Sequence, residues 1–143
     1  MLILHEKVKE EIIADALAAF PDECCGFLFG KEEGEERIVT AMQVVINAKE
    51  GDKRRRFAIA PKDYLRAEMF ADNNGLQLLG VYHSHPNHPA VPSEHDRVAA
   101  QPYFSYIIVS IIDNEWNSTR SWRLNSEQQF EEELVTDYQL IKN

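Results

Sequence analysis

Two histidines at alternate positions carry the clearest chemical signal in this sequence. His83 and His85 follow the apolar run 76–82, which has the length and composition of a buried strand. Side chains on a strand alternate between faces, so both imidazoles would point one way and Ser84 the other. Two adjacent imidazoles suit one transition metal; the alternative is a pair of solvent-tolerant histidines at a strand end.

A carboxylate eleven residues after His85 could complete a ligand set. With Asp96 the chain would offer three protein ligands, which leave one tetrahedral position open for water, as in a catalytic zinc site. Two histidines and a carboxylate also suit iron, so the residues alone do not fix the metal. Ser93-x-x-Asp96 is a helix-capping pattern as well, and the two readings are compatible because a capped helix would hold Asp96 rigidly.

A candidate base lies directly before another apolar run. Glu23 follows Pro-Asp, where an acid can equally be a surface turn residue, and Asp22 is a competitor. A metal lowers the pKa of its bound water to about 7, and a nearby carboxylate can take the proton. Cys24 and Cys25 are alternative nucleophiles, but their run contains no activating base.

These residues together resemble a known family. H-S-H at 83–85, seven further residues and then Ser93-x-x-Asp96 is similar to the signature of the JAMM (MPN-plus) zinc metalloproteases, in which a glutamate lies upstream. The short bacterial branch is most similar, because it shares the E-C-C-G start at 23–26 and a Trp-bearing strand near the end. The resemblance extends from the first helix to Trp122.

The resemblance implies roles, a fold and a substrate class. It assigns His83, His85 and Asp96 to one Zn²⁺ per chain, Glu23 to the general base and Ser93 to the oxyanion. The implied fold is α/β, a mixed β-sheet flanked by helices that is cytidine-deaminase-like. The implied reaction is hydrolysis of a peptide or isopeptide bond at the Gly-Gly tail of a ubiquitin-like sulfur-carrier protein. Two alternatives remain: a non-catalytic MPN-type interaction scaffold, and a RadC-type JAMM-like hydrolase with a different substrate.

Length and composition are those of an ordinary globular protein. The 143 residues, 44% hydrophobic and 27% charged, predict one domain over 1–143. No apolar run approaches the ~20 residues of a membrane span, and no secretory signal is visible, so we expect a cytoplasmic protein with two reduced cysteines. The net charge of −9 argues against nucleic-acid binding. The oligomeric state stays open, with a homodimer among the options.

Periodicity and turn residues predict the elements around the site. The last helix rests on a capping box of Ser126 and Gln129 and on the apolar positions Phe130, Leu134, Tyr138 and Ile141. His88, His95 and the basic run 53–56 have no assigned role; the run is either a solvated loop or a contact for an acidic partner. The expected strands are 1–4, 24–29, 37–47, 57–59, 76–82, 104–112 and 117–124, and the expected helices are 5–20, 61–73, 93–100 and one after 126.

Overall fold

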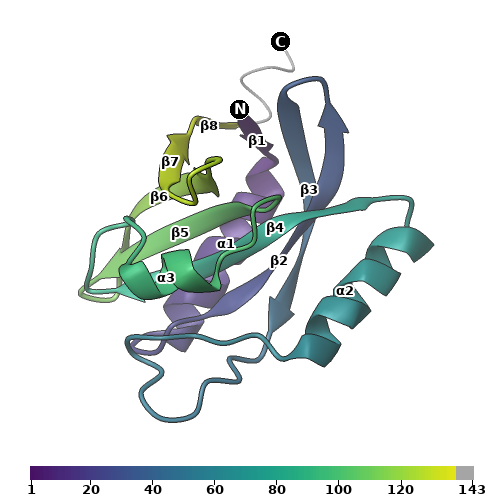
Figure 1. Ribbon diagram of the computed structural model, residues 1–143. Helices are drawn as coiled ribbons and strands as arrows, with labels where there is room; N and C mark the ends of the chain where they lie inside the picture. The colour runs from purple at the N-terminus through teal and green to yellow at the C-terminus, as the bar shows by residue number, and fades with distance from the viewer. Residues whose placement is uncertain (138–143) are drawn as a thin grey trace.

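One mixed β-sheet contains all the strands of the described part of the chain. The structure is a computed structural model that describes residues 1–137. Its strands are β1 (Leu2–Leu4), β2 (Cys25–Glu33), β3 (Glu36–Val45), β4 (Gln77–Pro86), β5 (Ser105–Ile112), β6 (Glu115–Leu124), β7 (Phe130–Glu133) and β8 (Val135–Asp137). Their order across the sheet is β7-β6-β5-β4-β2-β3-β1-β8 (Figure 1). Strand pairs β3-β1, β1-β8 and β4-β5 are parallel and the others antiparallel, which confirms the predicted mixed sheet.

Within residues 1–137 three helices flank this sheet, α1 (Glu6–Ala19), α2 (Pro61–Asn73) and α3 (Glu94–Ala99). Helix α1 covers one face: Val8, Ile12 and Ala16 are buried at helical spacing against apolar residues of β1, β2, β4 and β5. Helices α2 and α3 lie on the opposite face (Figure 1). Because side chains of β4 alternate, Tyr82 belongs to the α1 side and Val81 to the α2 side.

The centre of the sheet is packed so closely that Gly26 leaves no room for a side chain. A Cβ on Gly26 would lie 2.2 Å from the carbonyl oxygen of Gln43 and 2.2 Å from the Tyr82 ring. The predicted close approach of another backbone at Gly26 is therefore confirmed. It brings the start of β2 against β4, where Cys25 pairs with His83.

Most predicted elements are confirmed, with boundaries that differ by a few residues. Strand β4 extends to Pro86, so both histidines lie inside the strand rather than just after it. Parallel pairing with β5 continues as far as Ile111 and supports this extension. The prediction of a helix from Ser93 is confirmed as well, with Ser93 as the N-cap of α3.

The predicted last helix is wrong. The side chain of Asn125 accepts hydrogen bonds from the backbone N–H groups of Glu127 (2.9 Å) and Gln129 (3.0 Å), which closes a tight turn where the helix would begin. The chain then returns as β7 beside β6 and continues as β8 beside β1. Of the residues assigned to the helix, Ser126 lies in the turn, Phe130 in β7 and Leu134, 70% exposed, between the two strands; Tyr138 and Ile141 lie outside the described residues.

The predicted short strand at 57–59 is also wrong. Residues 46–60 form a loop between β3 and α2. The N–H of Ala58 bonds to the side chain of Asn47 (3.1 Å) and its carbonyl accepts from the N–H of Ala48 (2.9 Å). The Asn47 side chain and the Ala48 N–H thus hold Ala58 in the loop, and residues 57–59 form no strand.

None of the helices in residues 1–137 is long and apolar enough to cross a membrane.

Candidate functional site

The two histidines of β4 lie side by side on the face of the sheet that carries α2 and α3. Their ring centroids are 5.0 Å apart, as the alternation along the strand predicts. Asp96, the third residue of α3, reaches the same point. Ligand atoms of His83, His85 and Asp96 all lie within 4.8 Å of one another. Residues from a strand and a helix thus converge into a group that could hold one metal ion.

His85 is oriented through its second ring nitrogen. Its Nδ1 lies 3.0 Å from the carbonyl oxygen of Pro89 and donates to it, since a carbonyl can only accept. Its Nε2 is thereby directed at Asp96, with 3.1 Å between Nε2 and Oδ2. The Pro89 carbonyl is the kind of acceptor that the second ring nitrogen of a metal-ligating histidine ordinarily has, and sequence reasoning could not identify it. Burial alone would lower the pKa of His85, but Asp96 and the Pro89 carbonyl outweigh it and raise the pKa above its ordinary value.

His83 is held by packing instead. Its ring stacks on Phe57, with 4.4 Å between centroids and 26° between planes, and is almost fully buried. Nε2 lies 3.9 Å from Oδ1 of Asp96, while Nδ1 has no hydrogen-bond partner within residues 1–137. A buried nitrogen without a partner is costly in a protein interior. A bound metal ion would offset the free-energy cost of burying these donor atoms together.

Asp96 caps helix α3 and also belongs to the group of candidate metal ligands. Its N–H donates to Oγ of Ser93 (3.1 Å), and its Oδ2 accepts from the N–H of Ser93 (2.9 Å), which is a complete capping box. Burial would raise the pKa of this carboxyl, yet the neighbouring His83, the hydrogen bond from His85 and the Ser93 N–H hold it well below its usual range. Asp96 is therefore ionised, as a metal ligand must be.

Glu23 reaches the group from a distant part of the chain. Its carboxylate is buried, and Oε1 lies 3.7 Å from Nδ1 of His83. Oε1 also has no hydrogen-bond partner in the described part of the chain. Two of the three buried side-chain atoms without a partner in residues 1–137 thus face each other here. The donor set of two imidazoles and a carboxylate, with an unpartnered acid beside it, fits a zinc ion and one reacting water.

Three contacts fix the backbone at Glu23. Its N–H donates to the carbonyl of Lys53 (2.7 Å), and its carbonyl accepts from Nδ2 of Asn47 (3.2 Å). The next N–H, that of Cys24, donates to Oγ of Ser84 (2.8 Å). Ser84 points away from the histidines, as predicted, and joins their strand to the segment that carries the acid.

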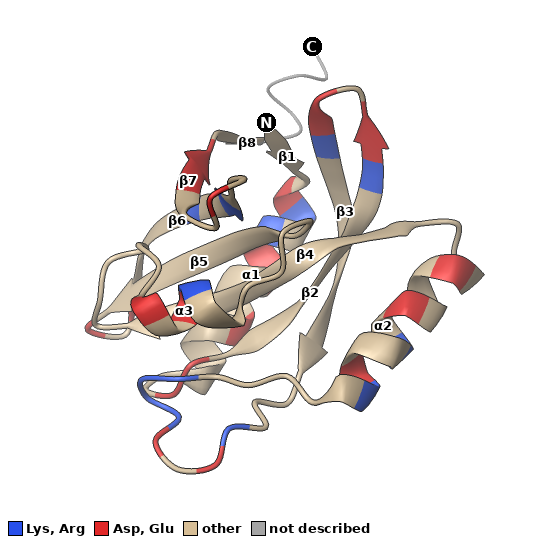
Figure 2. Cartoon of the chain, in the orientation of Figure 1, with Lys and Arg blue, Asp and Glu red and all other residues tan. Residues whose placement is uncertain are grey.

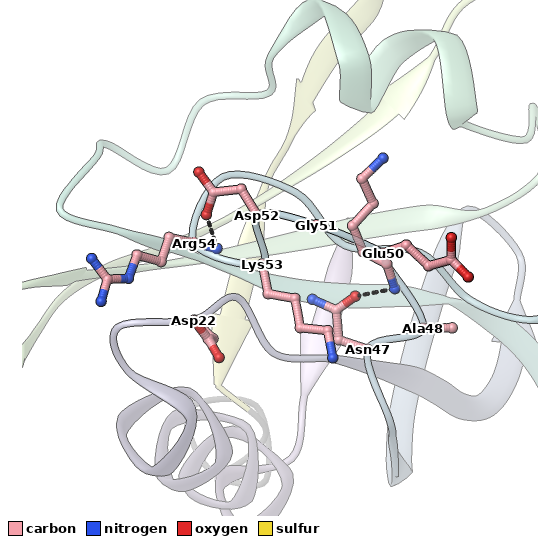
Figure 3. A pocket seen from close by; sticks show the side chains of 9 residues that line it. Asp22, Asn47, Ala48, Glu50, Gly51, Asp52, Lys53 and Arg54 are labelled. Carbon is pink, nitrogen blue, oxygen red and sulfur yellow. Dashed lines mark hydrogen bonds between the residues drawn. The ribbon is translucent and has the colours of Figure 1, made fainter.

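Asn47 uses all of its side-chain hydrogen-bonding groups in this region. Nδ2 also donates to the carbonyl of Arg56 (3.1 Å), and Oδ1 accepts from the N–H groups of Lys49 (3.0 Å) and Ala58 (3.1 Å). Figure 3 shows the Asn47 amide inside the loop, with one of its hydrogen bonds drawn as a dashed line. Sequence reasoning missed this residue. An amide at a strand end before a polar loop is a weak signal for such a clamp, and its partners depend on the fold.

Ser93 lies at the rim of the group. Its Oγ accepts from the N–H of Asp96, so the hydroxyl proton remains free to be donated elsewhere. Ser93, Glu23 and His85 line the same pocket of about 460 Å³, together with Arg55, His88, Pro89 and Val91.

A second pocket of about 410 Å³ also adjoins the candidate ligands. It is lined mainly by apolar and aromatic side chains of the sheet, α2 and the loop before α2, and it includes His83, His95 and Asp96. The volume is in the range of small-ligand and side-chain pockets. His95 thus faces this pocket, and His88 is exposed beside the other one.

The two cysteines take no part in this geometry. Both are free and buried, as predicted. Burial raises the pKa of Cys25 to about 12, and that of Cys24 still further. A thiol with such a pKa stays protonated and unreactive at neutral pH, which argues against nucleophilic catalysis.

Comparison with known proteins identifies the family. The Prok-JAB family, prokaryotic homologs of the JAB domain, matches residues 5–125, which include every residue of the site. The chain belongs to this family. The resemblance to JAMM proteins is thereby confirmed.

Curated relatives of this Prok-JAB chain are named as peptidases. A desampylase of Pyrococcus furiosus is 27% identical over 77% of this chain and 72% of its own. A protein of Thermus thermophilus named "Probable TtuB-protein conjugate cleaving protease" is 32% identical over 76% of this chain and 69% of its own. The CysO-cysteine peptidase of Mycobacterium tuberculosis is 27% identical over 87% and 83%.

Solved structures share the fold. A protein of Desulfitobacterium hafniense, solved in solution, superposes with a TM-score of 0.84 at 32% identity and covers 96% of this chain and 92% of its own. A JAB1/MPN domain protein of Archaeoglobus fulgidus has a TM-score of 0.60 at 19% identity over 94% and 97%. The predicted α/β fold of JAMM/MPN proteins is therefore confirmed.

Proposed function

We propose that residues 1–143 form one domain, a zinc-dependent peptidase that cleaves a peptide or isopeptide bond at the Gly-Gly tail of a ubiquitin-like sulfur-carrier protein. His83, His85 and Asp96 hold the zinc. The observation that carries this proposal is the position of Glu23. A buried carboxylate oxygen without a partner lies 3.7 Å from His83, although 60 residues separate the two in the chain.

The proposed chemistry divides among few residues. Zinc, when bound, polarises the scissile carbonyl and lowers the pKa of water. Glu23 takes a proton at Oε1 and returns it to the leaving amine, a role that suits a carboxylate with a free oxygen inside a buried site. Ser93 donates its free hydroxyl proton to the developing oxyanion, a contribution of about 3–4 kcal/mol for one such donor in hydrolases. No covalent bond to the protein forms.

The substrate class is supported by the relatives. Three of them are named for cleaving a conjugate, for desampylation or for a CysO-cysteine bond, and all are similar to this chain over most of its length. A flexible tail can enter a narrow site that a globular domain cannot. The scaffold alternative is disfavoured by the unpartnered Glu23, which an inactive domain has no reason to bury.

The test uses purified zinc-loaded protein and a carrier whose tail ends in Gly-Gly followed by cysteine or a longer extension. Intact mass should show loss of the C-terminal fragment with the wild type and no loss after chelation. Glu23→Gln should retain zinc but be slower by at least about 10³-fold. The matched control is Glu68→Gln, on the exposed surface of α2, which should cleave like the wild type. Equal cleavage by Glu23→Gln would refute the proposed mechanism.

A further inference from the structure

Four consecutive cations stand out on a chain that is otherwise acidic. The basic segment, residues 53–56 (K-R-R-R), holds four of the 15 lysines and arginines of a protein with a net charge of −9. All four residues are exposed. Figure 2 shows the segment as a blue stretch of the loop between β3 and α2, which also carries a second, shorter blue stretch and red ones. Concentrated charge of this kind attracts partners of opposite sign.

The basic segment is fixed beside the candidate site. The carbonyl of Lys53 accepts the N–H of Glu23 (2.7 Å), and the carbonyl of Arg56 accepts Nδ2 of Asn47 (3.1 Å). Both ends of the segment are therefore tied to the structure that positions the base. Arg55 lines the pocket that also contains Glu23 and Ser93. A partner protein bound to these cations would therefore lie next to the candidate site, within reach of its tail.

The charges of the segment are mostly available to a partner. Nε of Arg55 lies 3.8 Å from Oδ2 of Asp52, and both side chains are well exposed. Within residues 1–137, no carboxylate lies within ion-pair distance of the side chains of Lys53, Arg54 or Arg56. In Figure 3 the side chain of Arg54 extends away from the loop. Exposed cationic side chains that form no ion pair within their own protein can bind the surface of a partner protein with a small desolvation cost.

We propose that the basic segment docks an acidic surface of the substrate protein next to its tail. The inference rests on the proposed function and adds the chemistry of the partner: a folded ubiquitin-like carrier with Asp and Glu grouped near its C-terminus. A protein fits better than a nucleic acid, because four cations flanked by Glu50 and Asp52 on an acidic chain do not make the extended basic field that a phosphate backbone requires.

The docking has a kinetic signature that separates it from the chemistry. Contacts remote from the scissile bond, made by a charged rim, act mainly on association and on its dependence on salt. Hydrolysis of a short tail peptide, which lacks the acidic surface, does not use them. The ratio of kcat/KM for the folded carrier to kcat/KM for the peptide therefore reports the docking alone.

The experiment compares Lys53→Glu/Arg54→Glu with the wild type on both substrates. We expect the ratio to fall about tenfold or more, and we expect the wild-type ratio to decline between about 50 and 300 mM salt. A carrier whose surface Asp and Glu are changed to Asn and Gln should reproduce the fall with the wild-type enzyme. The matched control is Lys62→Glu/Arg66→Glu, an equal charge reversal on exposed α2, which should keep the wild-type ratio.

Three other results would contradict the docking, the proposed function or the choice of a protein partner, respectively. An unchanged ratio in the basic-segment variant, or an equal fall in the α2 control, would overturn the docking while leaving the peptidase intact. Cleavage of neither substrate by the wild type would refute the proposed function instead. Docking is then decided by fluorescence anisotropy of the same proteins with the labelled carrier. Equally tight binding of a DNA duplex at the same salt would overturn the choice of a protein partner.

Discussion

The three candidate metal ligands stand on regular secondary structure, whereas the candidate base stands on a segment held by loop contacts. His83 and His85 belong to a strand that is paired on both sides, and Asp96 belongs to a capped helix. Glu23 precedes β2 and is held through Asn47 and the loop beyond it. The difference indicates that metal binding and proton transfer depend on separate supports. Substitutions should therefore be able to damage one and leave the other.

The largest effect should come from the ligand side. His85→Ala removes one of three ligands, so we expect loss of bound zinc and a fall in activity of at least about 10³-fold. Metal content by mass spectrometry and peptide cleavage measure the two losses. His88→Ala, which removes an exposed histidine three residues away, should retain one zinc per chain. Full zinc content in His85→Ala would contradict the assigned ligand set.

A smaller effect should come from the base side. Asn47→Ala removes the amide that binds the Glu23 carbonyl and three groups of the loop. A displacement of the base by about 1 Å can cost up to about 10²-fold in rate, so we expect kcat to fall by about 10- to 100-fold while zinc content stays at one. The matched control, Asn74→Ala at the end of α2, should leave kcat unchanged. Loss of zinc together with activity would show that the two sides are not separate.

The link between the two sides should appear as stability. Ser84→Ala leaves the buried N–H of Cys24 without its acceptor, and we expect the free energy of unfolding to fall by about 1–3 kcal/mol. Denaturant titration measures this change. Ser118→Ala, on half-exposed β6, should stay within about 0.5 kcal/mol of the wild type. A neutral Ser84→Ala would mean that the hydroxyl is not needed to join β4 to the start of β2.

The smallest effect should be found at the cysteines, which lie between the two sides. Because burial raises the pKa of Cys25 to about 12 and that of Cys24 further, both thiols stay protonated at pH 8. We expect no alkylation of the native protein by iodoacetamide over an hour and modification of both thiols in denaturant. Intact mass gives the count. Rapid modification of the native protein would place a reactive thiolate beside Glu23.

The ligand side could be predicted from the sequence and the base side only in part. His83, His85 and Asp96 are close in the chain, and strand alternation places the two histidines on one face. Asp96 was assigned through the family spacing, since Ser93-x-x-Asp96 by itself is equally a helix-capping pattern. Glu23 was found through the family pattern, since an acid after Pro-Asp has no periodicity to direct it. The contacts of Asn47 could not be predicted, because they join segments whose proximity depends on the whole sheet.

The same distinction explains the two wrong elements. Apolar positions after residue 126 fit a helix, but the Asn125 side chain closes a turn first, and strands β6 and β1 offer partners that local patterning does not reveal. At 57–59 the residues favour a strand, but the Asn47 side chain and a backbone hydrogen bond from Ala48 hold Ala58 in a loop. The aromatic ring at Phe57 serves His83 instead. In both cases contacts with distant parts of the chain determined the secondary structure of a short segment whose local pattern was ambiguous.

The carboxylate of Asp96 also begins helix α3, because the oxygen nearest His85 is the one that accepts the N–H of Ser93. A cation bound to that oxygen would compete with the Ser93 N–H for its lone pairs. Zinc uptake should therefore be felt along the first turn of α3, where amide exchange would differ between the empty and the loaded protein. Replacing Asp96 would remove a candidate ligand and a capping hydrogen bond together, so a change at the site would also alter the start of α3.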